Sequence, residues 1–426
     1  MKTQQPKFFH VYRNVVAIVI TQFMRTTASS CYNTFWSLYL LELGASVTQI
    51  GLLSLISGCI VISLQLPIGH MVDTYGRRKF MIVLGYLEAF GMLLNSFANV
   101  WFWTIPGNIL VGVGGILQSI TIVAITDGIP PKKMGRVLSV RLFSMSLPGL
   151  FMPAVIGSFI DTVGIVTGVK TGLVFASVLS AVSATMNASL LRESSVKSKT
   201  KEKQRLSLSA FLGPLKNNYN LQLLTIESVA HFTCGSFMGT FAPIYMVKTV
   251  GISNTEYGLI NSIARVVGLL LRLPQGYIVD RVGNRRLVLI STAFRPVLLP
   301  LFVFSGSFLQ FTILQSLYVI LENDIEATAR QAYISSIVAE SEKGTAMLSS
   351  FAIGNIAMQG SSYANGLLWD AVGPVNSFYI NAAVYLIIGL PLLVKLRGEA
   401  TKEPNEESLV QPSVQNDSVG EAKAPG

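Results

Sequence analysis

The segment LQLPIGHMVDTYGRR, residues 64–78, returns 207 residues later as LRLPQGYIVDRVGNR, residues 271–285. Eight of the fifteen aligned positions are identical, and the same shift places Thr48 on Thr255 and Gly51 on Gly258. So many identities at one fixed offset indicate that the chain contains an internal duplication. Each half should then hold the same elements in the same orientation, with a path for solutes between the halves.

The composition places both halves in a membrane. Charged residues make up 13% of the chain, about half of the roughly 25% typical of soluble domains. Hydrophobic residues reach 51%, and the mean hydropathy is +0.54. A soluble fold of 426 residues needs more charge than this to cover its surface. These values exclude a disordered chain, a collagen, a disulfide miniprotein and an ordinary soluble enzyme, and they predict a polytopic α-helical membrane protein.

Twelve stretches are predicted to span the bilayer, six in each half. A span needs about 20 mostly apolar residues, and longer stretches are accommodated by tilting. The predicted spans cover residues 14–40, 47–72, 79–98, 101–126, 137–160, 168–191, 218–247, 254–278, 285–305, 307–333, 345–369 and 374–395.

The positive charges orient these spans. With the N-terminus in the cytoplasm, 24 of the 32 Lys and Arg residues fall in cytoplasmic segments, and only Lys170 and Lys248 fall in outside loops. This bias predicts that both termini are cytoplasmic. The same bias explains the net charge of +10, because the basic cytoplasmic loops face anionic lipid. No nucleic-acid partner is therefore expected. We expect a monomer in the plasma membrane.

The chain divides into four regions on this basis. Residues 1–191 and 217–397 form the two six-helix bundles. Residues 192–216 are polar and basic and form a cytoplasmic linker between them. Residues 398–426 are rich in Glu, Pro, Ser and Gly and are predicted to be a disordered cytoplasmic tail.

The repeated segment resembles the signature loop of the major facilitator superfamily, between spans 2 and 3 in the first copy and spans 8 and 9 in the second. The resemblance implies an all-α membrane protein whose twelve transmembrane helices form two pseudo-twofold-related six-helix bundles. It also implies that these loops latch the cytoplasmic side shut during transport, although they could simply fix the packing. The predicted latch residues are Gly69, Asp73, Gly76, Arg77, Arg78, Gly276, Asp280, Gly283, Arg285 and Arg286.

The residue types in the loops have physical reasons. Gly69, like its repeat, should let a neighbouring helix approach closely. Asp73 can accept hydrogen bonds from arginines and from the N-terminus of a neighbouring helix. Gly76 and Gly283 permit a tight turn. The loops depart from the family pattern at Thr74 and Asn284, where basic residues are usual.

Ionisable residues inside the spans are the candidate transport site. Each costs about 2.5–3.5 kcal/mol at mid-span, so each needs a partner or water. We expect Arg25 of span 1 and Arg265 of span 8 to form a cationic centre, with Arg265 paired to an acid of span 10. The candidates for substrate binding or proton coupling are Arg25, Glu227, His231, Arg265, Glu322, Asp324, Glu326 and Arg330.

Spacing separates the acids of span 10. Glu322, Glu326 and Arg330 follow at four-residue steps and share a face, so Glu326 and Arg330 can pair within the helix. Asp324 cannot face the same way in a regular helix. Either one acid meets a neighbouring helix, or the helix is irregular there.

Some interior charges are expected to be static. Glu88 and Arg295 match at the 207-residue shift with opposite charge, which favours structural ion pairs. Arg141 lies near the inner end of span 5, where its side chain can snorkel to the interface. For all of the candidate transport residues, the alternative interpretation is that they form static ion pairs that hold helices in register.

Small and polar residues also form stripes at steps of three and four. The stripe of span 8 is too polar to face lipid and should face the other half or a water-filled path. Spans 2 and 11 carry similar stripes. The stripe of span 8 is Gly258, Asn261, Arg265, Gly268, Arg272 and Gln275.

Together these patterns predict a secondary active transporter that moves a small solute by alternating access, coupled to protons, with a weak preference for an organic anion. Export of lipophilic compounds is an alternative, because span 5 holds a partial Gly-Pro-rich antiporter motif. A non-transporting sensor or scaffold on the same fold is another. The chain has no GxxxxGK[ST] loop and no nucleophile pattern, so neither an enzyme nor a cofactor is expected. His231 and Cys234 lack a third ligand, so no metal is expected.

Overall fold

The computed structural model describes residues 5–126, 129, 131–191, 213–216, 218–339 and 342–396. Within these ranges the regular structure is helical, and no strand occurs. The predicted basic linker lies outside the described residues except for 213–216, which are helical, and the predicted tail lies outside them entirely.

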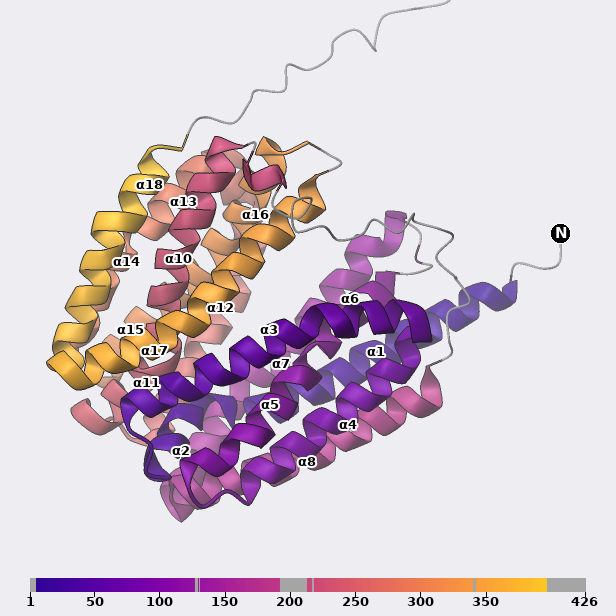
Figure 1. Ribbon diagram of the computed structural model, residues 1–426, viewed down its shortest axis with the longest axis horizontal. Coiled ribbons are helices and arrows are strands. Elements are labelled where there is room, and N and C mark those ends of the chain that lie inside the picture. The colour runs from indigo at the N-terminus through magenta and orange to yellow at the C-terminus, as the bar shows by residue number, and fades with distance from the viewer. Residues whose placement is uncertain are drawn as a thin grey trace, which may run out of the picture.

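The N-terminal half folds into one bundle of helices that run up and down its length (Figure 1). Its elements are α1 (Gln5–Ser30), η1 (Asn33–Phe35), α2 (Trp36–Glu42), α3 (Val47–Tyr75), α4 (Arg77–Ser96), η2 (Trp101–Trp103), α5 (Thr104–Gly115), α6 (Leu117–Thr126), α7 (Pro131–Val163) and α8 (Ile165–Leu190).

The C-terminal half forms a second bundle with the same plan. The elements η3, η4 and η5 are π-helical, and they continue the rods in which they lie. The elements are α10 (Tyr219–Thr240), α11 (Ala242–Ile244), η3 (Tyr245–Val250), α12 (Asn254–Val282), α13 (Asn284–Ala293), α14 (Arg295–Val303), α15 (Phe308–Tyr318), η4 (Val319–Ile325), α16 (Glu326–Ile337), α17 (Lys343–Val384), η5 (Tyr385–Gly389) and α18 (Leu390–Val394).

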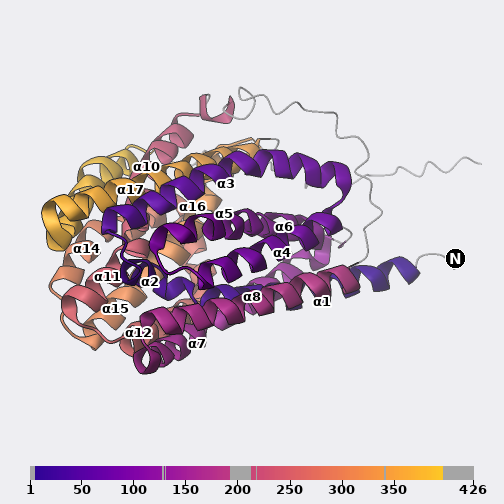
Figure 2. The same cartoon turned by 60° about the horizontal axis from the view of Figure 1, so that its bottom comes forward.

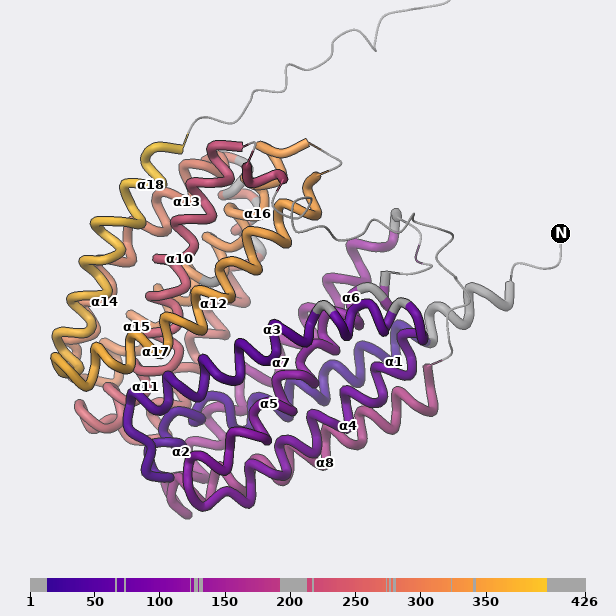
Figure 3. Tube along the Cα trace, in the orientation of Figure 1, coloured from indigo at the N-terminus to yellow at the C-terminus, as the bar shows by residue number. Residues whose placement is uncertain are grey.

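These helices fall on the twelve ranges predicted as spans. Helix α17 covers the last two of them, because the backbone turns at Gly373, where φ is 83°. Figure 3 shows the chain reversing direction within α17 and then continuing to α18. Among the described residues, six helical stretches are long and apolar enough to cross a membrane by length and composition. The count of twelve membrane crossings therefore remains a prediction from the sequence.

The duplication is visible in the backbone. Ser46 and Gln49 form a capping box at the start of α3, and the matching residues Ser253 and Glu256 make the same pair of contacts at the start of α12. The described glycines with positive φ also form pairs 207 or 209 residues apart. These pairs are Gly44 with Gly251, Gly76 with Gly283, and Gly164 with Gly373.

The two bundles meet at one end and diverge at the other (Figures 1 and 2). At the shared end, where α2 and α11 lie, one hydrophobic cluster contains residues of both halves, from Ala28 to Tyr385. At the diverging end each bundle has its own cluster, centred on residues such as Leu117 and Tyr333. Burial of apolar side chains therefore joins the bundles at only one end.

Candidate functional site

Two helix pairs form the seam between the bundles, α7 with α12 and α3 with α17. A Cβ on Gly258 of α12 would lie 2.2 Å from the carbonyl oxygen of Pro153 in α7. A Cβ on Gly51 of α3 would lie 2.3 Å from the carbonyl oxygen of Ser362 in α17. The polar and small stripes of spans 2, 8 and 11 thus face the other half at these positions, as predicted, and glycine is required for the close approach.

A carboxylate from each bundle caps a helix of the other bundle at the end where they meet. Asp161 of α7 accepts hydrogen bonds from Asn254 (N at 3.2 Å and Nδ2 at 2.8 Å) and from Thr255 (N at 2.8 Å and Oγ1 at 2.6 Å) at the start of α12. Asp370 of α17 accepts one from the backbone N–H of Thr48 at the start of α3, at 3.1 Å. These contacts stabilise closure of the seam because carboxylates favour helix N-termini.

An ion pair across the same end adds to this closure. Lys248 of the C-terminal bundle pairs with Glu42 of the N-terminal bundle. The pair is exposed, so its contribution is small.

Arg265 lies on the α12 side of the seam. Its side chain is exposed, and Nη1 lies 3.1 Å from the Cβ position of Gly149 in α7. The expected pairing of Arg265 with an acid of span 10 is wrong, because Glu322 and Asp324 pair with other arginines. Among the described residues, no carboxylate lies within ion-pair distance of Arg265.

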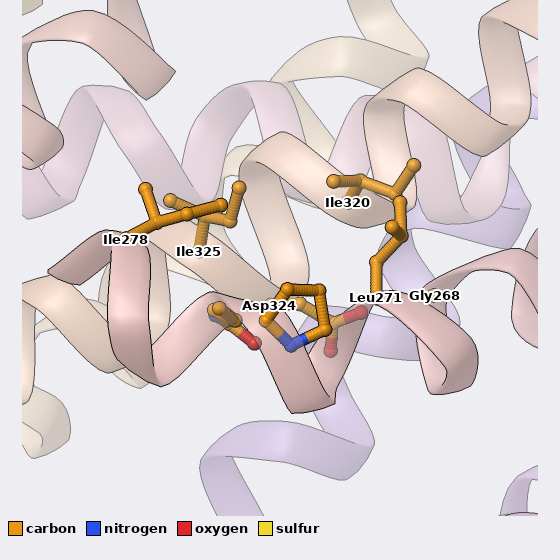
Figure 4. A pocket seen from close by; sticks show the side chains of 8 residues that line it. Gly268, Leu271, Ile278, Ile320, Asp324 and Ile325 are labelled. Carbon is orange, nitrogen blue, oxygen red and sulfur yellow. The ribbon is translucent and has the colours of Figure 1, made fainter.

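Asp324 pairs with Arg272, one helix away. The Arg272 Nη2 to Asp324 Oδ1 distance is 2.9 Å, and Arg272 Nη1 also donates to Ser146 of α7, at 3.3 Å. Figure 4 shows Asp324 beside a small pocket between α12 and η4, whose walls include Gly268, Leu271 and Ile320.

The helix that carries Asp324 is irregular, which is one of the two arrangements that the spacing of Glu322 and Asp324 allowed. Val319–Ile325 is π-helical, and Glu322 and Asp324 within it reach different helices. Glu322 pairs with Arg295 of α14, and both side chains are almost completely buried. The other alternative, that one acid meets a neighbouring helix, is therefore also correct.

Glu227, Glu326 and Arg330 form a buried cluster inside the C-terminal bundle. Arg330 pairs with Glu326 one turn away, as predicted, and with Glu227 of α10. The hydroxyl of Tyr385 also donates to Glu227. The His231 Nε2 to Glu326 Oε2 distance is 3.9 Å, and Nδ1 of His231 is buried with no partner.

The clusters of the C-terminal bundle touch one another through Arg295. Its Nη1 donates to the carbonyl oxygen of His231 at 3.0 Å, and its guanidinium lies 4.7 Å from the ring centroid of Tyr385. Among the described residues, three carboxylates (Glu227, Glu322 and Glu326) therefore share two guanidinium groups. With all five groups ionised and His231 neutral, the site carries one net negative charge.

Arg25 belongs to a separate pair in the N-terminal bundle. Its Nε and Nη2 lie 2.7 Å and 2.6 Å from Oε2 of Glu88, and both residues are buried. The expected cationic centre of Arg25 with Arg265 is thus wrong for this conformation, because Arg25 is already neutralised. The structural role expected for Glu88 agrees with this pair.

Arg141 does not snorkel. Its side chain is 3% exposed, and its Nε and Nη2 are buried without a hydrogen-bond partner. The prediction failed because α7 runs from Pro131, which places Arg141 almost three turns inside the helix and against the bundle interior.

The latch segments lie at the diverging end. Gly76 and Gly283 have φ of 95° and 83° and form the tight turns that were predicted. Arg78 donates to the carbonyl oxygen of Ala188 in its own bundle. No described residue of a neighbouring helix lies within 4 Å of the Cβ position of Gly69, so the part of the chain that the structure describes makes no close helix approach there.

The remaining latch residues divide into two groups. The surroundings of Asp73, Gly276 and Asp280 lie outside the described part of the chain. Arg77 has an interaction partner, and Arg285 and Arg286 lie in the first turn of α13.

Sequence reasoning missed the two seam carboxylates, although a signal was present. The pattern Asp-x-x-Gly occurs at Asp161 as DTVG and at Asp370 as DAVG, and each glycine is one of the positive-φ turns. The latch segments contain the same pattern, as DTYG and DRVG. Tyr385 gave no comparable signal.

Comparisons with known proteins agree with this architecture. The sequence model of the Major Facilitator Superfamily matches residues 18–228 and 223–420. An uncharacterized MFS-type transporter of Methanocaldococcus jannaschii is 23% identical over 386 residues, which cover 89% of this chain and 97% of that protein. A nitrite extrusion protein of Bacillus subtilis is 24% identical over 257 residues, which cover 58% of this chain and 60% of that protein.

Solved structures share the fold. A mutant of the nucleoside transporter NupG has a TM-score of 0.75 at 12% identity, covering 90% of this chain and 100% of that chain. A bacterial homolog of the human lysosomal transporter Spinster, inward-facing and unoccupied, has a TM-score of 0.72 at 13% identity, covering 90% and 96%. At such identities the likeness concerns the fold alone. The chain belongs to the Major Facilitator Superfamily, and it is a multi-pass membrane protein and secondary transporter of that superfamily.

Proposed function

We propose that this transporter moves a small anion, organic or inorganic, in exchange for or together with protons, and that Arg265 is its substrate-binding cation. The observation that carries the proposal is the guanidinium of Arg265, which has no carboxylate partner among the described residues and is exposed at the seam against Gly149 of the opposite bundle. A cation at membrane depth needs a counter-charge or water, and an anionic substrate supplies the counter-charge. The similarity to a nitrite extrusion protein points to the same charge.

Proton coupling is assigned to the buried cluster of the C-terminal bundle. Three carboxylates and two guanidinium groups leave one negative charge, which a single proton neutralises. We assign that proton to His231 and Glu326, whose side chains face each other at 3.9 Å. His231 has a free Nδ1, so it can accept a proton without breaking a hydrogen bond.

Alternating access follows from the seam. The end that carries Gly76 and Gly283 is expected in the cytoplasm, so the divergence of the bundles there corresponds to an inward-facing state. Transport to the other side requires Asp161 and Asp370 to release the helix N-termini that they cap. The latch carboxylates Asp73 and Asp280 repeat the same pattern at the opposite end, and we assign them the equivalent contacts in the outward-facing state.

The setting completes the proposal. We place the protein in the plasma membrane as a monomer with both termini in the cytoplasm. Anionic lipids would contact the basic loops that contain Arg78 and Arg285. Metal ions and cofactors have no role in the proposed cycle.

Reconstitution in vesicles tests the proposal. Pools of small anions, nucleosides and lipophilic cations are presented with and without a pH gradient. We expect an anion to accumulate and the accumulation to collapse with the gradient. Transport of lipophilic cations alone would support the exporter alternative, and binding without flux would support a sensor.

A further inference from the structure

Arg141 is a buried cation that the proposed mechanism does not use. Its side chain is 3% exposed, yet Nε and Nη2 have no hydrogen-bond partner. An arginine stays protonated under all conditions that proteins meet, so burial cannot be relieved by loss of a proton. Such a charge needs an anion or water, and no described residue supplies the anion.

The surroundings of Arg141 add positive charge and do not compensate its own. Among the described residues, Arg25 is a charged group that acts on Arg141; it is also a cation, and it is already paired with Glu88. Helix α7 contains no acidic residue before Asp161, at its far end. No carboxylate of the described residues therefore forms an ion pair with Arg141 in this conformation.

The position of Arg141 connects it to Arg265. Arg141 precedes Gly149 by two four-residue steps on α7, about 80° around the helix and toward the bundle interior, and Gly149 is the residue that Arg265 contacts. The rise of a helix places the Cα of Arg141 about 12 Å from that of Gly149, toward the diverging end. Between them, the hydroxyl oxygen of Ser146 accepts a hydrogen bond from Arg272 of α12. Arg265, Arg272 and Arg141 therefore lie along α7, from the middle of the seam toward the expected cytoplasmic end.

We propose that Arg141 is a second anion-binding site, occluded in this conformation, which takes a planar oxyanion (a carboxylate or a nitrogen oxyanion) as it passes between Arg265 and the cytoplasm. This inference rests on the proposed function, because it assumes that Arg265 binds the same anion. The planar guanidinium matches such an anion through two parallel hydrogen bonds, and Nε and Nη2 are one of its two-donor edges.

Binding to the purified full-length protein tests the site. Sodium nitrite, sodium nitrate and sodium acetate are titrated separately at low ionic strength, with calorimetry and thermal unfolding as readouts. The variants are Arg141→Gln, Arg141→Met and Arg265→Gln. Arg136→Gln is the matched control, because Arg136 is exposed on the same helix and its loss removes the same charge.

We expect Arg141→Gln to weaken binding of at least one of these anions by about tenfold or more, as loss of a buried charge partner does, while Arg136→Gln binds like the wild type. Without anion, Arg141→Met should unfold at a higher temperature than the wild type, because an unpaired charge has been removed from the interior. Added anion should reduce that difference.

Three results would overturn the inference. The first is wild-type affinity for all three anions in Arg141→Gln while Arg265→Gln loses affinity, which would leave the proposed function standing. The second is wild-type affinity in both variants, which would reject the proposed function as well. The third is failure of both Arg141 variants to fold, since that would give Arg141 a structural partner.

Discussion

Replacement of Asp161 by alanine should open the end at which the bundles meet. In the structure the Asp161 carboxylate accepts four hydrogen bonds from Asn254 and Thr255, all across the seam. Loss of a helix cap costs about 0.5–2 kcal/mol, and loss of a carboxylate at a helix N-terminus costs about 0.3–1 kcal/mol. Because Asp161 is exposed, we take the lower part of these ranges and expect about 1–2 kcal/mol in total.

A change of this size shifts the balance between the closed and open seam about 5–30-fold. Spin labels at Val163 and Thr249, exposed positions on opposite bundles at this end, report the shift as a longer distance in double electron–electron resonance. The labels require a background without the exposed Cys59. Asp161→Asn keeps one side-chain oxygen and should give a smaller shift.

Glu256→Ala is the matched control for this prediction. Glu256 is a carboxylate at the start of the same helix, but it bonds only to Ser253 of its own bundle. We expect its removal to leave the label distance unchanged. An Asp161→Ala distance distribution identical to that of the wild type would refute the role of this cap in closing the seam.

Further predictions concern the seam and the buried charges. Gly258→Ala should disfavour closure by about 1–3 kcal/mol, since its Cβ would meet a backbone oxygen at 2.2 Å, and unchanged label distances would contradict this. Arg330→Met should destabilise the protein by about 3–5 kcal/mol in thermal or denaturant unfolding, because Glu227 and Glu326 lose their cation, and Glu227→Gln in the same chain should restore part of the loss. His231→Gln should abolish proton movement with the substrate while leaving substrate exchange intact, and a wild-type pH change inside vesicles would exclude His231 as the carrier.

The fold was predictable because it depends on patterns that repeat along the chain. The duplication and the apolar stretches led to two equivalent bundles, and the matching capping residues Ser46 and Ser253 show how closely the halves agree. The stripe through Gly258 predicted the seam, since a small polar face has no place in lipid. The angle between Glu322 and Asp324 indicated either an irregular helix or contact with a neighbouring helix, and the structure shows both.

The ion pairs were less predictable. Pairing depends on how each helix is rotated and on which neighbour lies within the reach of a long arginine side chain. Arg265 and Arg295 both lie at about the same depth in the membrane as the acids of span 10. Glu322 pairs with Arg295 because of how α14 packs, which the sequence does not show. Arg25 was expected at the cavity, but it pairs with Glu88 of another helix, and no pattern in the sequence shows that these two side chains meet.

Uptake of a single anion into vesicles by Arg265→Gln tests the central claim most directly. The anion is the one that the wild-type protein accumulates, and Arg136→Gln, which removes an exposed charge near the start of α7, is measured beside it. Loss of a charge partner predicts uptake lower by about thirtyfold or more in Arg265→Gln, with normal insertion into the membrane and normal uptake by the control. Wild-type uptake by Arg265→Gln would contradict the assignment of this arginine as the group that binds the transported anion.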